Sequence, residues 1–327
     1  MKKVMVVMGT RPEAIKMCPL IKVLKCDPYF KVITCITSQH KEMLAQVLDV
    51  FNVIPDYDLD IMKSGQTLFD ITVEILSKIK EIFEKERPEV VLVHGDTTTA
   101  FASGLAAFYL NIPIGHVEAG LRTYNLHAPF PEEFNRMAVD IIADYYFAPT
   151  KKAAQNLISE GKDRKKIFIT GNTAIDAMKY TVTQDYETEF IKWVEGSRLI
   201  LLTAHRRENL GAPMRSMFKA IKRIVNEFED IKVIYPVHLN PLVREAANEI
   251  LGNHERIKLI EPLQVKDFHN FMARSYIILT DSGGIQEEAP SLGKPVLVMR
   301  DTTERPEGIK AGTLKLVGTK EETIYKN

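Results

Sequence analysis

The regular alternation of short apolar segments with amphipathic segments is the feature that most restricts how this sequence can fold. Strands separated by single helices require parallel sheets with right-handed crossovers. The sequence therefore predicts the α/β class, as two doubly wound domains facing each other across a cleft. The predicted strands are Val4–Met8, Lys31–Thr37, Glu89–Val93, Pro113–Val117, Tyr145–Ala148 and Ile167–Thr170, then Leu199–Thr203, Lys232–Tyr235, Lys258–Ile260, Ile277–Thr280 and Pro295–Met299.

Two domains also fit the chain length, because single hydrophobic cores stop growing near ~250–300 residues and this chain has 327. We place an N-terminal Rossmann-like domain at residues 1–171, and a connecting helix with a C-terminal Rossmann-like domain at residues 172–327. Pro55 to Gly65 is predicted to be a loop, and Asn172–Gly196 the connecting helix. Predicted helices include His40–Phe51, Gln66–Lys85, Thr98–Leu110, Lys151–Ser159 and Met214–Phe228, and others that open at Pro12 and Pro131.

The charge balance excludes several classes of partner. The chain has 43 Lys and Arg against 43 Asp and Glu, so no general attraction to nucleic acid or to an anionic membrane is expected. No apolar run reaches the ~18 residues of a membrane span. Cys18, Cys26 and Cys35 lack CxxC spacing, which is typical of a reducing cytosol and predicts no metal site. We therefore expect a cytoplasmic protein.

The segment LTDSGGIQEEAP, residues 279–290, predicts a phosphate site. An apolar strand ends at Asp281, and Ser282, Gly283 and Gly284 precede a helix. Glycines let the backbone turn tightly and approach a ligand, and a helix N-terminus offers N–H groups and partial positive charge. A carboxylate in the first turn, from Glu287 or Glu288, would suit the hydroxyls of a ribose. An ordinary strand-to-helix turn with a solvated first turn remains an equal alternative.

Cations follow the first predicted strand. In parallel sheets, ligands bind at the carboxyl ends of the strands, and here that position carries Arg11 and, one turn later, Lys16. Arg as a planar fork and Lys as a point charge would suit a diphosphate, although surface charge at a helix start explains either residue alone. Neither a GxGxxG nor a Walker sequence is present, so a dinucleotide site is not supported.

Carboxylates follow the other strands of the first half. Asp96 is either a functional acid or a cap of the next helix. Glu118 ends an apolar strand, where a carboxylate is unfavourable unless it is paired or functional. His116 shares a strand face with Glu118, but two alternating ligands are a weak metal signal and a hydrogen-bonded core histidine is favoured. Glu132 and Arg136 have the spacing of an ordinary i,i+4 ion pair.

The second half places other groups at its strand ends. His205 and Arg206 follow Leu199–Thr203, and His238 follows the next strand. Phe268 would lie against a base, and Arg305 would add a cation. Carboxylates in one half, with a phosphate site and histidines in the other, indicate a sugar nucleotide as the ligand.

Six segments extend this interpretation to a family: GTRPEAIKM, HGDTTTAF, GHVEAGLRT, PFPEEFNR, TAHRREN and TDSGGIQEEAP. On these segments the chain resembles the non-hydrolysing UDP-N-acetylglucosamine 2-epimerases, from Val4 to about Gly318. This resemblance implies the glycosyltransferase-B architecture, a homodimer and a role in cell-envelope polysaccharide biosynthesis. It also implies reversible conversion of UDP-N-acetylglucosamine to UDP-N-acetylmannosamine, by elimination of UDP to a glycal and re-addition, without a cofactor.

The resemblance assigns roles to individual residues. Asp96, Glu118 and Glu132 would be the acid and base carboxylates, and His205 would assist near the diphosphate. The residues that would bind the UDP-sugar substrate are Arg11, Lys16, Arg136, Phe268, Ser282, Gly283, Gly284, Glu288 and Arg305.

Two departures from the family pattern leave questions open. Many relatives bind a second UDP-N-acetylglucosamine as an activator, in the region matched by Gln39, His40, Arg206 and His238. Gly65 and Glu42 stand where those relatives commonly have arginine and glutamine, so substrate activation is an open question. Relatives also continue some tens of residues beyond Asn327, and a native end there would weaken domain closure and activity.

Four alternatives to the reversible epimerase remain. The same fold supports transfer of the sugar to an acceptor. A hydrolysing epimerase would release free N-acetylmannosamine. A sister enzyme would use a diacetamido-uronic acid sugar nucleotide. A UDP-sugar binding protein would bind the nucleotide sugar and catalyse no reaction.

Overall fold

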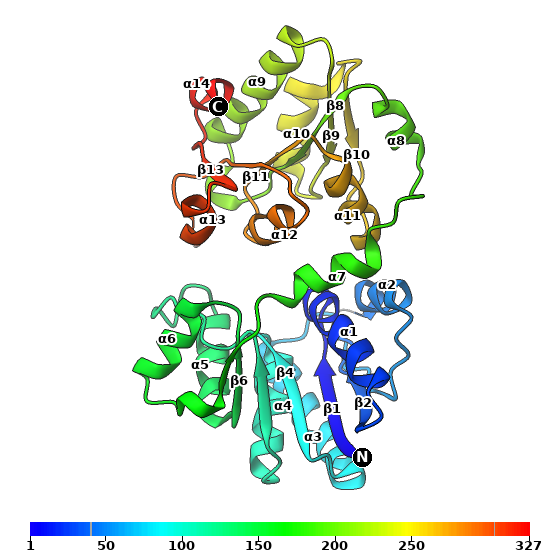
Figure 1. Cartoon of the computed structure of the whole chain (residues 1–327), viewed down its shortest axis with the longest axis vertical. Coiled ribbons are helices and arrows are strands. Elements are labelled where there is room, and N and C mark those ends of the chain that lie inside the picture. The colour runs from blue at the N-terminus through cyan, green and yellow to red at the C-terminus, as the bar shows by residue number, and fades with distance from the viewer. Residues whose placement is uncertain (40, 304) are drawn as a thin grey trace. The chain divides into compact units, whose positions relative to one another are not determined.

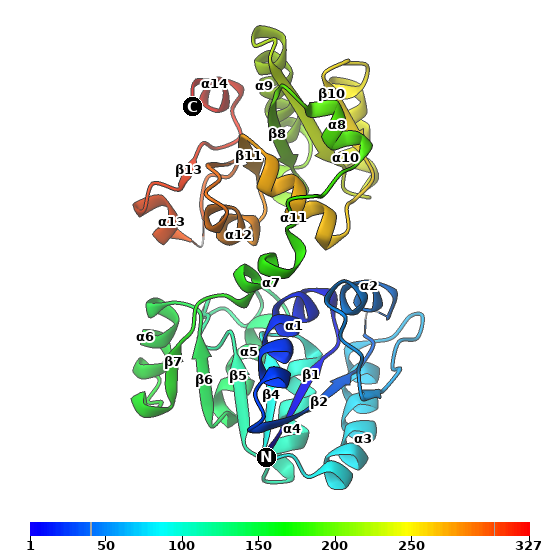
Figure 2. The same cartoon turned by 45° about the vertical axis from the view of Figure 1, so that its right-hand side comes forward.

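The computed structural model describes residues 1–39, 41–303 and 305–327 and divides into two units (Figures 1 and 2). The first is Met1–Tyr180 and the second is Thr181–Asn327. Each unit has its own parallel sheet and its own hydrophobic core. The predicted class of two doubly wound α/β domains is therefore confirmed.

The first unit contains a seven-stranded sheet in the order β3-β2-β1-β4-β5-β6-β7, with every neighbouring pair parallel. Its strands are β1 (Lys2–Met8), β2 (Phe30–Ile36), β3 (Tyr57–Asp58), β4 (Val90–His94), β5 (Ile114–Val117), β6 (Tyr145–Ala148) and β7 (Ile167–Ile169). Its helices are α1 (Arg11–Cys26), α2 (Lys41–Phe51), α3 (Leu68–Glu86), α4 (Thr98–Tyr109), α5 (Glu132–Ile142), α6 (Lys151–Ser159) and α7 (Thr173–Thr181), with a 3-10 turn at Arg164–Lys166. The helices pack their apolar faces on the sheet. Because a parallel sheet is covered on both faces in this way, its strands are nearly continuous runs of apolar residues.

The second unit contains a six-stranded parallel sheet in the order β10-β9-β8-β11-β12-β13. Its strands are β8 (Arg198–Thr203), β9 (Ile231–Pro236), β10 (Ile257–Ile260), β11 (Ile277–Thr280), β12 (Val296–Val298) and β13 (Leu314–Leu316). Its helices are α8 (Glu189–Val194), α9 (Ala212–Glu227), α10 (Pro241–Ala247), α11 (Val265–Arg274), α12 (Ile285–Ser291), α13 (Pro306–Lys310) and α14 (Glu321–Lys326), with a 3-10 turn at Arg207–Asn209 and a π-helical turn at Asn248–Gly252.

In each sheet the strand order reverses at one point. The reversal lies between β1 and β4 in the first unit and between β8 and β11 in the second. Connections leave in opposite directions there, so a crevice opens at the carboxyl ends of the two strands, where open α/β sheets bind ligands. This topology directs attention to the loops after β1, β4, β8 and β11.

The structure corrects two predictions about secondary structure. Asn172–Gly196 is not one helix, because α7 ends at Thr181 and α8 begins at Glu189. Contacts with α11 hold the chain between them: the Thr181 hydroxyl lies 2.7 Å from His269 Nδ1, and the Thr183 N–H donates to Asn270. The predicted loop of residues 55–65 also contains the short strand β3. The predicted helix start at His40 lies outside the described residues.

Replacing Gly9 with alanine is expected to destabilise the first unit. An alanine Cβ at this position would lie 2.1 Å from Thr37 Oγ1 and 2.3 Å from Thr99 Oγ1. Both threonines are buried and their hydroxyls are hydrogen-bonded to each other, so neither side chain can move freely. Overpacking of this kind lowers the free energy of unfolding by about 1–3 kcal/mol. Urea unfolding followed by circular dichroism measures the change.

Gly104→Ala is the matched control. Its Cβ would meet the nearest side-chain atom, Ile142 Cδ1, at 3.6 Å, which is ordinary contact inside α4. Alanine in a helix interior is more stable than glycine by roughly 0.5–1 kcal/mol. A Gly9→Ala protein as stable as Gly104→Ala would contradict the packing described here.

Candidate active site

The carboxyl ends of β1, β4 and β5 bring together four of the residues selected from the sequence. Lys16 of α1 forms an ion pair with Glu118, which follows β5. Arg136 of α5 forms an ion pair with Asp96, which follows β4. The Glu118 carboxylate is close enough to contribute, through charge repulsion, to the raised pKa of Asp96. The result is two partly accessible acids, each held by one cation.

Asp96 is not the cap of α4. Thr97 occupies that position, and its side chain accepts a hydrogen bond from the Ala100 N–H at 2.9 Å. The Asp96 carboxylate is therefore available for another purpose. Burial raises the pKa of Asp96, the Arg136 charge opposes that rise, and Glu118 adds to it. A partly exposed carboxyl group with a raised pKa is suited to proton transfer.

Glu118 has a left-handed backbone conformation, with φ of +67°. Such a conformation in a non-glycine residue persists only where its surroundings fix it. The Glu118 and Ala119 N–H groups both donate to the Phe147 carbonyl of β6, at 3.0 and 3.1 Å. This arrangement turns the Glu118 side chain out of the strand, where only 14% of it is exposed.

His94, the last residue of β4, was not selected from the sequence. Its Nε2 lies 3.6 Å from Glu118 Oε2 and, among the described residues, has no hydrogen-bond partner although it is buried. Burial lowers the pKa of His94 to about 3, so the ring is neutral at physiological pH. The feature of the sequence that could have identified His94 was its position at a strand end, directly before Gly95 and two residues before Asp96.

The predicted pairing of Glu132 with Arg136 is wrong. Arg136 contacts Glu133, at 3.1 Å, as well as Asp96. Glu133 is fully buried and also accepts hydrogen bonds from the Thr123 and Tyr124 N–H groups, so its orientation is fixed. Glu132 is half-buried at the first position of α5.

His116 is a hydrogen-bonded core histidine, as favoured from the sequence. It is fully buried, and both ring nitrogens have partners, in Asp140 and in the Gly95 carbonyl. Across residues 1–39, 41–303 and 305–327, no group of three His, Cys, Asp or Glu side chains is arranged to hold a metal ion.

The loop after β1 is linked to the loop after β4. Glu13 is buried and accepts hydrogen bonds from the Gly9 and Thr10 N–H groups, at 3.0 and 2.8 Å, and from the Thr97 hydroxyl, at 2.7 Å. Arg11, at the start of α1, is half-buried, and burial lowers its pKa. Gln39 accepts a hydrogen bond from Thr99 at 2.9 Å, whereas His40 lies outside the described residues.

In the second unit, the Ser282-Gly283-Gly284 turn joins β11 to α12. Neither glycine has positive φ, so the turn does not need left-handed backbone. Guanidinium groups lie close to Gly283: a Cβ there would be 3.1 Å from Arg305 Nη1 and 3.5 Å from Arg206 Nη2. Two guanidinium groups therefore lie against the backbone of this turn, which makes it a place for an anion.

Asp281 organises the loop after β8. Its fully buried carboxylate accepts hydrogen bonds from the His205 and Arg206 N–H groups, each at 2.9 Å, and from Asn209 Nδ2, at 3.1 Å. The His205 ring lies 5.5 Å from that of His238, nearly parallel to it. Burial lowers the pKa of His205, so the neutral imidazole is favoured.

Glu288 of α12 lies beside α11. Its Oε2 is 3.9 Å from Nε2 of His269, and the half-buried Phe268 is the preceding residue of that helix. The second unit thus places Glu288, Arg305, Arg206 and His205 around the end of β11, the strand where its order reverses.

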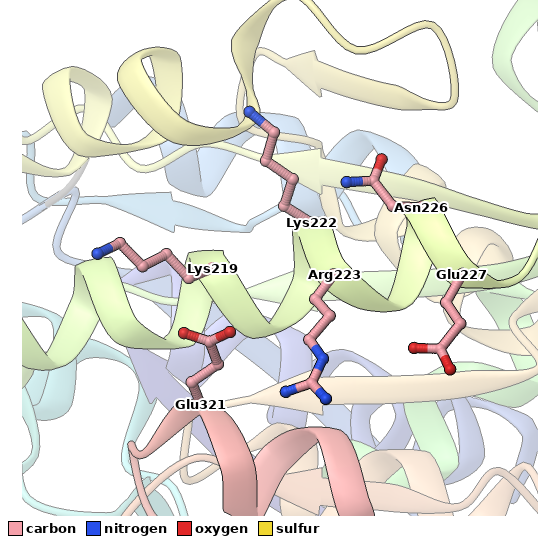
Figure 3. Close-up of a pocket in the computed structure, with 6 residues that line it drawn as sticks. All are labelled: Lys219, Lys222, Arg223, Asn226, Glu227 and Glu321. Atoms are coloured by element: carbon pink, nitrogen blue, oxygen red, sulfur yellow. The ribbon is translucent and has the colours of Figure 1, made fainter.

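A hollow of about 490 Å³ lies between α9 and α14, away from these loops (Figure 3). One of its cations, Arg223, is paired with Glu322 at 2.6 Å and lies over the Tyr325 ring at 3.8 Å. None of the residues selected from the sequence is among its lining residues, which are Lys219, Lys222, Arg223, Asn226, Glu227 and Glu321.

Within the described ranges, none of the helices is both long enough and apolar enough to cross a lipid bilayer.

Residues 22–327 match the family UDP-N-acetylglucosamine 2-epimerase. The UDP-N-acetylglucosamine 2-epimerase of Bacillus subtilis (strain 168) is 61% identical over 324 residues, which are 99% of this chain and 85% of the relative. The crystal structure of UDP-GlcNAc 2-epimerase from Neisseria meningitidis bound to UDP-GlcNAc has a TM-score of 0.86 at 48% identity, covering 99% of this chain and 90% of that one. The Methanocaldococcus jannaschii enzyme in complex with UDP-GlcNAc and UDP has a TM-score of 0.77 at 35% identity, covering 99% and 91%. This chain therefore belongs to the UDP-N-acetylglucosamine 2-epimerase family.

Proposed function

We propose that this protein interconverts UDP-N-acetylglucosamine and UDP-N-acetylmannosamine by eliminating UDP and adding it back. The observation that carries this proposal is the pair of acids after β4 and β5, Asp96 with Arg136 and Glu118 with Lys16. The names and bound ligands of the relatives support the choice of UDP-N-acetylglucosamine as the substrate.

The chemistry explains why paired acids are needed. The hydrogen on C2 of the sugar is not next to a carbonyl group, so simple enolisation cannot remove it. Loss of that proton together with the UDP leaving group gives a glycal, and the proton then returns to the opposite face as UDP adds back. Each positioned acid or base contributes about 10²–10⁴ to the rate of such a proton transfer. Asp96, Glu118 and Glu132 are the proposed acids and bases.

The second unit is proposed to hold the departing UDP. Arg206 and Arg305 lie against Gly283 in the turn that precedes α12, and would stabilise the charge that develops on the diphosphate. His205 would assist there as a neutral hydrogen-bonding group. Glu288 would bind the ribose and Phe268 would lie against the uracil. Arg11 and Lys16 of the first unit complete the proposed substrate contacts.

The proposal includes a cytoplasmic homodimer. Sedimentation equilibrium would test the dimer, which should appear as a particle of twice the 37.1 kDa chain mass.

Substrate activation through Gln39, His40, Arg206 and His238 remains a prediction.

One NMR experiment tests the reaction itself. The protein is incubated with UDP-N-acetylglucosamine in D2O, and the sugar signals are followed. Reversible epimerisation should place deuterium at C2 in both epimers while UDP remains attached at equilibrium. Release of free N-acetylmannosamine would instead identify a hydrolysing enzyme. An unchanged spectrum would contradict both kinds of epimerase and would support glycosyl transfer or binding without catalysis.

A further inference from the structure

Four side chains form a series of contacts next to the two acid-bearing loops, buried at His116 and Asp140 and ending at the exposed Glu160. His116 Nδ1 lies 2.6 Å from Asp140 Oδ1, and Asp140 Oδ2 lies 2.7 Å from Arg122 Nη1. Arg122 in turn donates from Nε and Nη2 to Glu160, at 2.8 and 2.7 Å. The side chains of His116, Asp140 and Arg122 are at most 1% exposed. We call this series the ion chain.

The hydrogen bonds of His116 define its protonation state. Its Nδ1 faces a carboxylate oxygen, and its Nε2 faces the Gly95 carbonyl oxygen at 2.8 Å. A carboxylate and a carbonyl both accept hydrogen bonds and cannot donate. Each ring nitrogen must therefore carry a proton, because a bare nitrogen at either distance would place two lone pairs against each other. His116 is thus an imidazolium cation inside the core.

The charges around His116 support this state. With His116 charged, positive and negative groups alternate along the ion chain and its formal charge is zero. Burial alone would raise the pKa of Asp140, but the charges of His116 and Arg122 hold it below its ordinary value. Two titratable groups on the neighbouring strands, His94 and Tyr146, are neutral: burial lowers the pKa of His94 to about 3 and raises that of Tyr146 to about 12.

The ion chain holds both loops that carry the proposed acids. His116 binds the Gly95 carbonyl, which belongs to the peptide bond immediately before Asp96. Asp140 Oδ2 accepts from the Gly120 N–H at 3.1 Å, two residues after Glu118. Glu118 has left-handed backbone, with φ of +67°, and such a conformation in a non-glycine residue needs support from its surroundings. One buried ion pair thus supports the backbone on both sides of the acid pair.

We propose that His116, held as an imidazolium by Asp140, is a positioning residue that sets the separation of the Asp96 and Glu118 carboxylates. It touches neither the substrate nor the reacting atoms in this role. The inference rests on the proposed function only for the consequence of misplacing the acids. A displacement of about 1 Å at such a site can lower the rate by about 10²-fold.

The protonation state is tested on the wild-type protein by NMR. With ¹⁵N-labelled histidine rings at neutral pH, both nitrogens of His116 should carry a proton, because each faces an acceptor oxygen. The signal is assigned by correlation to the backbone of residue 116, so the measurement does not depend on a folded variant. A ring with one bare nitrogen would overturn the proposal.

The positioning role is tested with two substitutions of His116. Asparagine reaches about as far as Nδ1 and keeps a donor for Asp140, whereas glutamine reaches about as far as Nε2 and keeps a donor for the Gly95 carbonyl. H116N should lower kcat for C2 exchange by about 10–100-fold, with KM and UDP affinity unchanged, and H116Q should retain several-fold more activity. H254Q, altered at an exposed histidine bonded to Asn226, is the control and should match wild type.

The outcomes separate this inference from the proposed function. Equal losses in H116N and H116Q, or a rise in KM with unchanged kcat, would overturn the positioning role. Wild-type protein that exchanges no deuterium would refute the proposed function instead. The NMR measurement would still decide the charge of His116 in that case.

Discussion

Replacing Asp96 with asparagine is expected to lower the rate of C2 deuterium exchange by about 10²–10⁴-fold, the contribution of one general acid or base. Asparagine has nearly the same shape and keeps a carbonyl oxygen for Arg136, but it cannot accept and return a proton. The UDP affinity of the variant should remain within about two-fold of wild type, because the proposed diphosphate site is built from the second unit. Exchange is measured by NMR in D2O, and affinity by calorimetry with UDP.

Asp49→Asn provides the matched control for this substitution. Asp49 is exposed on α2 and is not one of the proposed site residues. The same chemical change there should leave exchange and binding unaltered. Full exchange in Asp96→Asn would show that Asp96 only orients Arg136, and the role of proton donor or acceptor would then pass to Glu118 or Glu132.

Replacing Arg305 with glutamine is expected to raise the dissociation constant for UDP by about 10–150-fold. This range corresponds to the 1.5–3 kcal/mol typical of a hydrogen bond to a charged group. The guanidinium group contacts the Gly283 position that the diphosphate is proposed to occupy, and its Nε is held by Glu287. Calorimetric titration with UDP measures the dissociation constants of the variant and of wild type. The difference in affinity should become smaller as salt screens the remaining charges.

The corresponding control is Arg223→Gln, in the same unit. Arg223 is paired with Glu322 on the surface between α9 and α14 and should not affect nucleotide affinity. If Arg305→Gln and Arg223→Gln bound UDP equally well, the turn after β11 would not be the diphosphate site. Thermal melts would show whether either protein had lost its fold.

The sequence by itself was sufficient for the architecture, and it grouped the residues of the candidate site. Strand and helix periodicity are local properties, and the right-handed crossover is close to obligatory, so few topologies remained. The same rule brings the carboxyl ends of parallel strands to one edge of a sheet. This is why Asp96 and Glu118 could be grouped without a structure, and why Gly283 could be associated with an anion.

Only the tertiary structure decided which partners these residues have. Sequence spacing favoured Glu132 as the partner of Arg136, yet the packing of α5 turns Arg136 toward Asp96 and Glu133. Spacing also left Asp96 as a possible helix cap, a position that Thr97 takes because α4 begins at Thr98. The contacts of His116 join β5 to Gly95, 21 residues earlier, and to Asp140, 24 residues later. Such contacts depend on how a helix is rotated on its sheet, and that rotation is set by the whole core rather than by neighbouring residues.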